Sequence, residues 1–181
     1  MELRNLYEEM LRTFPDKHLV FGEGCIGARV CLIGEAPGEK EDEAGRPFVG
    51  KAGKQLDEFL SISGIRRESV FITNAVKFRP TSEGKKGLVN RTPTKKEIEA
   101  FRPFLLKELE LLKPEIIVTL GNTPLFAVTG ENLRIGDVHG ALLKHGDFTL
   151  YPMYHPASVI YNRSLKDTYT ADVVRLGEKL K

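Results

Sequence analysis

The stretch that decides the fold is RVCLIGEAPG, residues 29–38. Its first half is a short apolar segment that ends on Gly34, which is typical of a buried strand in a parallel sheet. Its second half contains two glycines and a proline, which predicts a tight turn whose backbone N–H groups can face a ligand. Residues 29–38 therefore predict a buried strand that leads directly into a binding loop.

Three more apolar segments, at residues 70–76, 115–121 and 148–154, also predict strands. Helical spacing of apolar residues lies between them, and Thr94 and Glu97 form the pattern of a helix-opening capping box. Strands that alternate with helices predict a parallel sheet covered on both faces. We expect one domain over residues 1–181, with a central four-stranded, mainly parallel sheet.

The composition is ordinary for a globular protein, with 41% hydrophobic and 29% charged residues. No stretch approaches the ~20 apolar residues that span a bilayer. The first five residues show no charged-then-apolar leader. We therefore expect a cytoplasmic protein that does not bind a membrane.

Positive charge is concentrated in residues 77–107, which carry a net charge of +6 while the rest of the chain carries −4. Such a segment can attract a polyanion, because neutralised phosphates release counterions. The charge count by itself favours the simpler alternative, a solvated loop and helix face.

Three polar residues stand where predicted strands end, namely Glu35, Asn74 and His155. Ligands of parallel sheets bind beyond the carboxyl ends of the strands, so these residues are expected to meet. Glu35, together with Glu41 in the loop, could hold or activate a water. The Asn74 amide offers the donor and acceptor that match the edge of uracil or thymine, and His155 can donate to a leaving-group oxygen.

Each of these residues also has a structural interpretation. Phe48 could stack on a planar base, but in isolation it is more often a core residue. Asn74 could be a satisfied core amide, and Glu41 could belong to a solvated acidic loop. The nucleotide-phosphate motifs GxGxxG and GxxxxGK[ST] do not occur.

Taken together, the motifs resemble the family 4 uracil-DNA glycosylases, in order and over nearly the whole chain. They are GEAPG (34–38) with Glu41-Asp42, RPFVG (46–50), TNAVK (73–77), NRTP (90–93) and HPA (155–157).

The resemblance implies a three-layer α/β/α fold and hydrolysis of the N-glycosidic bond of deoxyuridine in DNA, with the nucleotide flipped out. It implies that uracil-containing DNA is the partner, and we expect a monomer. Glu35, Glu41, Asn90 and His155 would be catalytic, and Ala36, Phe48 and Asn74 would bind uracil. The implied DNA contacts are Lys77, Arg79, Lys85, Lys86, Arg91 and the wedge Ser158, Val159 and Ile160.

The chain departs from the family in its cysteines. Typical members hold a 4Fe–4S cluster on four cysteines, but Phe78 and Phe101 stand at two of those places, and the first 20 residues contain no cysteine. Cys25 and Cys31 do not match the pattern. We therefore predict no cluster and no other metal, with aromatic packing in its place.

A second departure is the stretch 81–89, which is longer than the short proline turn of the family. It is either a DNA-contacting flap or a tolerated insertion. A related subgroup captures uracil-DNA covalently through a histidine here, but this chain offers Asn90 instead, so turnover is expected.

Two other functions stay open at this point. One is a glycosylase of altered range, acting on hypoxanthine or mismatched bases. The other is a DNA- or uracil-binding protein without catalysis, which would have no need of Glu35, Asn74, Asn90 and His155 together.

Overall fold

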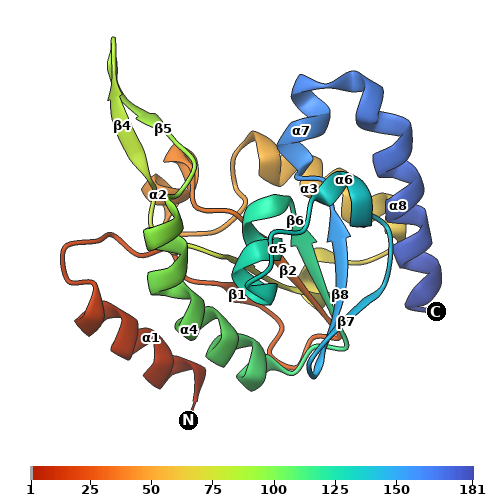
Figure 1. Ribbon diagram of the computed structural model, residues 1–181, viewed down its shortest axis with the longest axis horizontal. Coiled ribbons are helices and arrows are strands. Elements are labelled where there is room, and N and C mark those ends of the chain that lie inside the picture. Colours follow the sequence, from red (N-terminus) through yellow and green to blue (C-terminus); the bar gives the residue numbers. More distant parts are fainter. Residues whose placement is uncertain (1) are drawn as a thin grey trace.

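The centre of the protein is a six-stranded sheet (Figure 1). The computed structural model describes residues 2–181, so Met1, on which part of the leader prediction rests, lies outside the described residues. The strands lie in the order β1-β3-β2-β6-β8-β7. Their bounds are β1 Glu23–Gly24, β2 Val30–Gly34, β3 Phe71–Asn74, β6 Ile116–Leu120, β7 Leu143–His145 and β8 Phe148–Met153.

The four inner strands are parallel, as expected, and two antiparallel edge strands enlarge the sheet. The predicted count of four strands is therefore too low. The edge strands β1 and β7 span only two and three residues, which is too short for a periodic apolar pattern to mark them.

Helices cover both faces of the sheet and make three layers (Figure 1). One layer contains α1 (Leu3–Thr13), α4 (Lys95–Leu112) and α5 (Asn122–Thr129), and the other contains α3 (Lys51–Ser63) and α8 (Lys166–Lys179). The Thr94–Glu97 capping box opens α4 as predicted. The shorter elements are α2 Glu39–Ala44, η1 Arg67–Ser69, α6 Ile135–Val138, α7 Pro156–Tyr161 and η2 Arg163–Leu165.

Strand β2 explains why its segment is apolar without alternation. Cys31 and Ile33 pack in the core cluster beneath α1 and α4, whereas Val30 and Leu32 pack in the cluster beneath α3 and α8. Both faces of the strand are buried, so every position must be apolar. No helix among residues 2–181 is long and apolar enough to cross a membrane.

Residues 81–90, which contain the stretch interpreted from the sequence as a flap or an insertion, form a hairpin. Strand β4 (Thr81–Gly84) pairs with β5 (Gly87–Asn90), and the turn between them is Lys85-Lys86. Gly87 has a φ of +117°, which a residue with a side chain rarely adopts. The polar and glycine-rich strands lack the apolar alternation that would have predicted them.

Candidate active site

A pocket of about 540 Å³ opens at the carboxyl edge of the parallel strands. It brings together residues from the ends of β2, β3 and β8, the hairpin root and α7, as the sheet rule predicts. The predicted site residues that line it are Glu35, Ala36, Glu41, Phe48, Asn74, Asn90, Arg91, His155 and Ile160.

Two of these side chains, those of Asn74 and Phe48, meet at the backbone of Gly34. A Cβ atom at Gly34 would overlap Asn74 Oδ1 and would lie 2.5 Å from Cζ of Phe48. The amide of Asn74 and the ring of Phe48 therefore approach the same point of the backbone. An amide edge beside an aromatic face suits a planar base that is both stacked and hydrogen-bonded.

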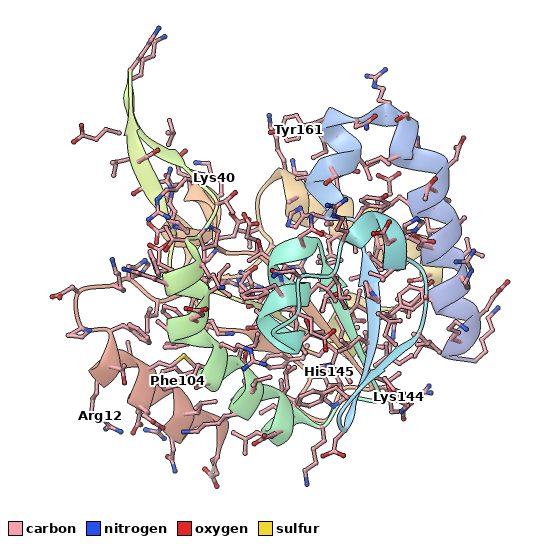
Figure 2. All side chains as sticks on the ribbon, viewed as in Figure 1. Arg12, Lys40, Phe104, Lys144, His145 and Tyr161 are labelled. Carbon is pink, nitrogen blue, oxygen red and sulfur yellow. The ribbon has the colours of Figure 1, made fainter. Side chains whose placement is uncertain are left out.

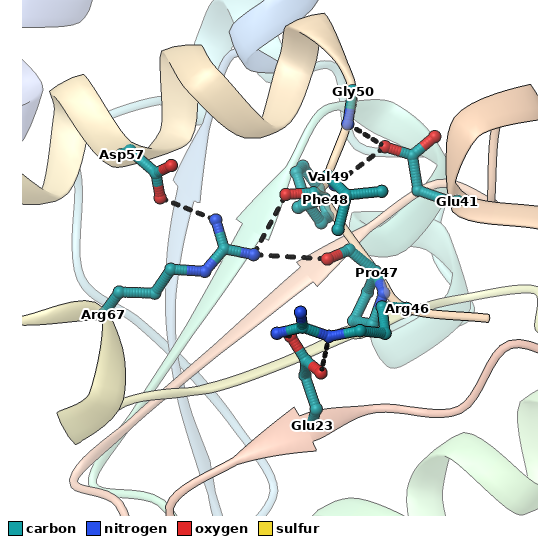
Figure 3. Close-up of polar contacts among 9 residues, drawn as sticks. All are labelled: Glu23, Glu41, Arg46, Pro47, Phe48, Val49, Gly50, Asp57 and Arg67. Atoms are coloured by element: carbon teal, nitrogen blue, oxygen red, sulfur yellow. Dashed lines mark hydrogen bonds and ion pairs between the residues drawn. The ribbon is translucent and has the colours of Figure 1, made fainter. Parts of the chain in front are cut away.

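Phe48 is held in an unusual conformation, with a φ of 53°. The guanidinium of Arg67 donates hydrogen bonds to the carbonyls of Phe48 (3.0 Å) and Pro47 (3.2 Å), and Asp57 holds the same guanidinium at 2.6 Å (Figure 3). A backbone with positive φ is strained for an aromatic residue, so it is kept only where the surrounding structure holds it. Arg67 supplies this support, and the sequence analysis did not identify it.

Glu41 ties the binding loop to the start of α3. One of its carboxylate oxygens, Oε1, accepts hydrogen bonds from the backbone N–H groups of Val49 (3.0 Å) and Gly50 (2.7 Å) (Figure 3). Its other oxygen, Oε2, lies close to Gly38, where a Cβ atom would be 2.8 Å away. The geometry thus gives Glu41 a role in shaping the pocket.

Glu35 is held from the opposite side. The hydroxyl of Thr123, in the first turn of α5, donates a 2.6 Å hydrogen bond to Glu35 Oε2. Glu35 is partly exposed and lines both this pocket and a neighbouring hollow bounded by Thr123 and Tyr161. A carboxylate that is oriented by one hydrogen bond and still faces open space can hold a water.

His155 is a neutral hydrogen-bond donor. Burial lowers its pKa from 6.5 to about 4, against a smaller opposing effect of Glu41. The backbone N–H of Ala157 donates to His155 Nδ1 at 3.1 Å, so the proton of the neutral ring is on Nε2. The ring centre lies 6.0 Å from that of Phe48.

Two arginines fix the hairpin root. Arg79 donates to Asn90 Oδ1 at 2.6 Å and pairs with Glu39, and Arg91 pairs with Glu97 through two hydrogen bonds of 2.8 and 2.7 Å. Only 14% of the Arg79 side chain is exposed, whereas Arg91 keeps 33% exposed.

The structure contradicts the predicted DNA contact of Lys77, because this side chain is 0% exposed. Its ammonium donates to Glu108 Oε2 at 2.6 Å and to the carbonyl of Asn74 at 2.9 Å. Tyr7 donates to the other oxygen of Glu108 at 2.6 Å. The lysine turns inward because α4 supplies the buried carboxylate of Glu108. The sequence does not indicate this partner, because Glu108 stands among the apolar residues of the helix face.

The structure places the predicted wedge in α7, where Ser158 and Val159 are half-buried and Val159 packs against the core cluster beneath α3 and α8. Ile160 is 39% exposed, and Tyr161, which the sequence analysis missed, is 88% exposed and lines the pocket. The helical turn that starts at Pro156 faces residue 159 inward and residue 161 outward.

Aromatic rings occupy the region of the two missing cysteines. Phe101 stacks on Phe14 with ring centres 4.2 Å apart and lies 5.8 Å from Phe78. Cys31 is buried in β2 and Cys25 is exposed beyond β1. Residues 2–181 contain no group of three or more His, Cys, Asp or Glu side chains that could hold a metal ion.

Comparison with known proteins shows which family the chain is similar to. The model of the "Uracil DNA glycosylase superfamily" matches residues 21–176. The chain is 45% identical to the Type-4 uracil-DNA glycosylase of Thermotoga maritima over 149 residues, 81% of this chain and 74% of that protein. It is 40% identical to the Type-4 enzyme of Sulfurisphaera tokodaii (87% and 72% covered) and 30% identical to the Type-5 enzyme of Pyrobaculum aerophilum (84% and 72%).

Proposed function

This chain belongs to the uracil-DNA glycosylase superfamily, and on that basis we propose that its pocket excises uracil from DNA. The reaction hydrolyses the N-glycosidic bond of deoxyuridine, releases uracil and leaves an abasic site. The observation that carries the proposal is the meeting of Asn74, Phe48 and His155 around one pocket at the carboxyl edge of the sheet.

The flipped uracil stacks on Phe48 in this proposal, and Asn74 reads its edge. Oδ1 of the amide accepts from uracil N3–H while the NH₂ group donates to O4, a pairing that cytosine cannot satisfy. The backbone N–H of Ala36 contacts the base as well. Flipping costs a few kcal/mol, which stacking and base-edge hydrogen bonds offset.

His155 stabilises the departing base. As the bond between C1′ and N1 breaks, its electron pair passes to the uracil ring and negative charge develops on O2. The Nε2–H of the neutral ring donates to that oxygen. A depressed pKa suits this role, because the ring donates a hydrogen bond without losing or gaining a proton across the neutral range.

Glu35 serves the sugar side. It holds the attacking water, accepts its proton as oxygen bonds to C1′, and its charge stabilises the positive sugar of the transition state. Thr123 keeps the carboxylate in place. The NH₂ group of Asn90 donates a hydrogen bond to the water or the sugar, because its carbonyl oxygen already accepts one from Arg79.

The DNA-contacting set consists of Lys85, Lys86 and Arg91 on one side of the pocket and Ile160 with Tyr161 on the other. Arg79 acts as an anchor of Asn90 in place of its predicted phosphate contact. We also propose that the chain works as a monomer and as one domain.

The residues present do not fit the 4Fe–4S cluster of typical relatives. A cluster needs thiolates, and the positions concerned hold the rings of Phe78 and Phe101, which pack against each other at an angle. No step of the proposed mechanism uses the cluster. Protein purified without oxygen should contain no iron; iron with an absorbance near about 400 nm would contradict this proposal.

The decisive experiment is cleavage of an oligonucleotide that contains one uracil, followed by alkali. Strand scission with uracil supports the proposal, cleavage only at hypoxanthine or G·T identifies an altered range, and binding without scission identifies a non-catalytic protein. His155→Ala should slow cleavage while sparing binding, and Asn74→Asp should weaken or shift base choice. Full activity of His155→Ala would overturn the role of this residue.

A further inference from the structure

We propose that the β4–β5 hairpin is a groove ribbon, a two-stranded element that enters a groove of duplex DNA beside the flipped nucleotide. The preferred substrate is therefore uracil in duplex DNA. The inference rests on the proposed function and adds to it the form of the DNA and a surface that reads it. Apart from Asn90, no residue of the hairpin belongs to the motifs that resemble the family.

The hairpin stands away from the body of the protein (Figure 1). Its two strands form a sheet of their own, and residues 82–90 are all exposed. Leu88 is 61% exposed and Val89 is 48% exposed. An isolated hairpin of this length is marginally stable, and about half or more of each of its two large apolar side chains stays exposed. These properties indicate a surface that is covered by a partner.

The root of the hairpin is held by hydrogen bonds and lines the pocket. Asn90, the last residue of β5, lines the pocket and is bonded to Arg79. Arg91 donates to the carbonyl of Thr81 at 3.0 Å and is itself fixed by Glu97. Because both strands are anchored at this end, the direction of the hairpin relative to the pocket is set before DNA binds.

The tip identifies the partner as a polyanion. Lys85 and Lys86 form the turn, and Glu83 is the only acidic residue of the hairpin. A two-stranded ribbon fits the major groove of B-DNA, and lysines at its tip reach phosphates. Leu88 and Val89 point to opposite faces of the ribbon, so one of them faces the base edges, where apolar contact is possible, and the other faces a wall of the groove.

The length of the hairpin sets how many base pairs of flanking duplex it can contact. Four residues per strand extend about 14 Å, which corresponds to about four base pairs of duplex. Tyr161 lies on the same side of the molecule as the hairpin, whereas Lys144 lies at the opposite end (Figures 1 and 2). DNA that passes over the pocket thus meets α7 and the hairpin together.

The test compares uracil release from a long duplex with release from a short single strand. The double variant Lys85→Ser/Lys86→Ser is matched to Lys144→Ser/Lys179→Ser, which removes the same charge far from the pocket. A second variant, Leu88→Ser/Val89→Thr, removes the apolar contacts and leaves the charge.

We expect each hairpin variant to lower the duplex-to-single-strand ratio of kcat/KM about tenfold, and the control to leave it unchanged. The lysine variant should also reduce the salt slope of duplex binding by about 2, since each neutralised phosphate contributes about 0.9. Duplexes shortened stepwise on one side should lose the advantage within about five base pairs.

An unchanged ratio in both hairpin variants, with uracil still released, would overturn the groove ribbon and leave the proposed function intact. Absence of uracil release from every substrate by the unmodified protein would instead overturn the proposed function. A stable dimer in sedimentation that the apolar variant abolishes, with an unchanged ratio, would assign the hairpin to self-association.

Discussion

Gly34 is the residue at which base recognition depends on a missing side chain. Asn74 and Phe48 both occupy the space that a Cβ atom would need. Gly34 also ends a strand buried on both faces, so its backbone has little freedom to retreat. Asn74 and Phe48, the two residues that the proposed mechanism assigns to the base, therefore require a glycine at position 34.

Gly34→Ala should therefore lower kcat/KM on uracil-containing DNA by about 100-fold, because displacements near 1 Å at a reacting site have effects of that order. Steady-state release of uracil measures this loss, and circular dichroism checks that the fold is kept. Gly136→Ala is the control, because its φ is not in the left-handed region and the added Cβ atom would meet only the Tyr154 hydroxyl, at an ordinary contact distance of 3.6 Å. Equal activity of the two variants would show that Asn74 and Phe48 do not read the base.

Arg67 is a positioning residue for Phe48, since it touches only the backbone of the loop. Arg67→Met should raise KM more than it lowers kcat, because a misplaced ring weakens stacking of the bound base. We expect about a tenfold rise in KM, equivalent to about 1.4 kcal/mol, within the range of one stacking contact. Asp57→Asn, which keeps the guanidinium, should have a smaller effect, and a pure kcat effect of Arg67→Met would contradict the assignment.

The pH dependence of the site follows from His155. Its pKa of about 4 keeps the ring neutral at higher pH, so kcat should show no break near 6.5, where an ordinary histidine titrates. The unfolded chain binds this proton between pH 6.5 and 4 and the folded chain does not, so the free energy of unfolding falls as the pH drops through that window. A break in kcat near pH 6.5 that His155→Gln removes would contradict the neutral ring.

At the scale of elements, the segment that follows β3 is joined to α4 by a buried ion pair beneath the pocket. Lys77 and Glu108 are both fully buried, and Lys77 also holds the carbonyl of Asn74. The pair therefore connects the helix layer to the strand end that carries Asn74, the amide to which the proposed mechanism assigns base recognition. Burial beside Glu108 raises the pKa of Tyr7, which completes the network.

Removal of one partner leaves an uncompensated charge, so Lys77→Met should lower the free energy of unfolding by about 3–5 kcal/mol. The double variant Lys77→Met/Glu108→Leu should recover most of that loss, since no buried charge remains. Urea denaturation measures both values. A double variant as unstable as Lys77→Met would show that the stabilisation comes from packing of the lysine chain and not from its charge.

At the scale of the whole molecule, the aromatic group of Phe14, Phe78 and Phe101 joins segments that are distant in sequence. It connects the end of α1, the segment after β3 and the first half of α4. Rings packed in this way can hold the layers together without a metal, because each buries a large apolar area.

Phe101→Ala should accordingly lower the free energy of unfolding by about 3–5 kcal/mol, the usual cost of a buried phenylalanine. Thermal and urea unfolding measure the change, and Phe148→Ala, at the partly exposed first residue of β8, is the comparison. A loss below about 1 kcal/mol for Phe101→Ala would show that the aromatic group does not support the layers.

The sequence by itself determined the parallel sheet and the pocket edge, because apolar runs and Gly/Pro turns are local signals and strand ends follow from them. It placed Glu35, Asn74, Phe48 and His155 correctly at that edge. Only the tertiary structure decided the inward turn of Lys77, the support of Phe48 by Arg67 and the exposure of Tyr161. Each of those depends on a partner or a helix face distant in the chain, and charge or residue type does not say which partner a side chain meets.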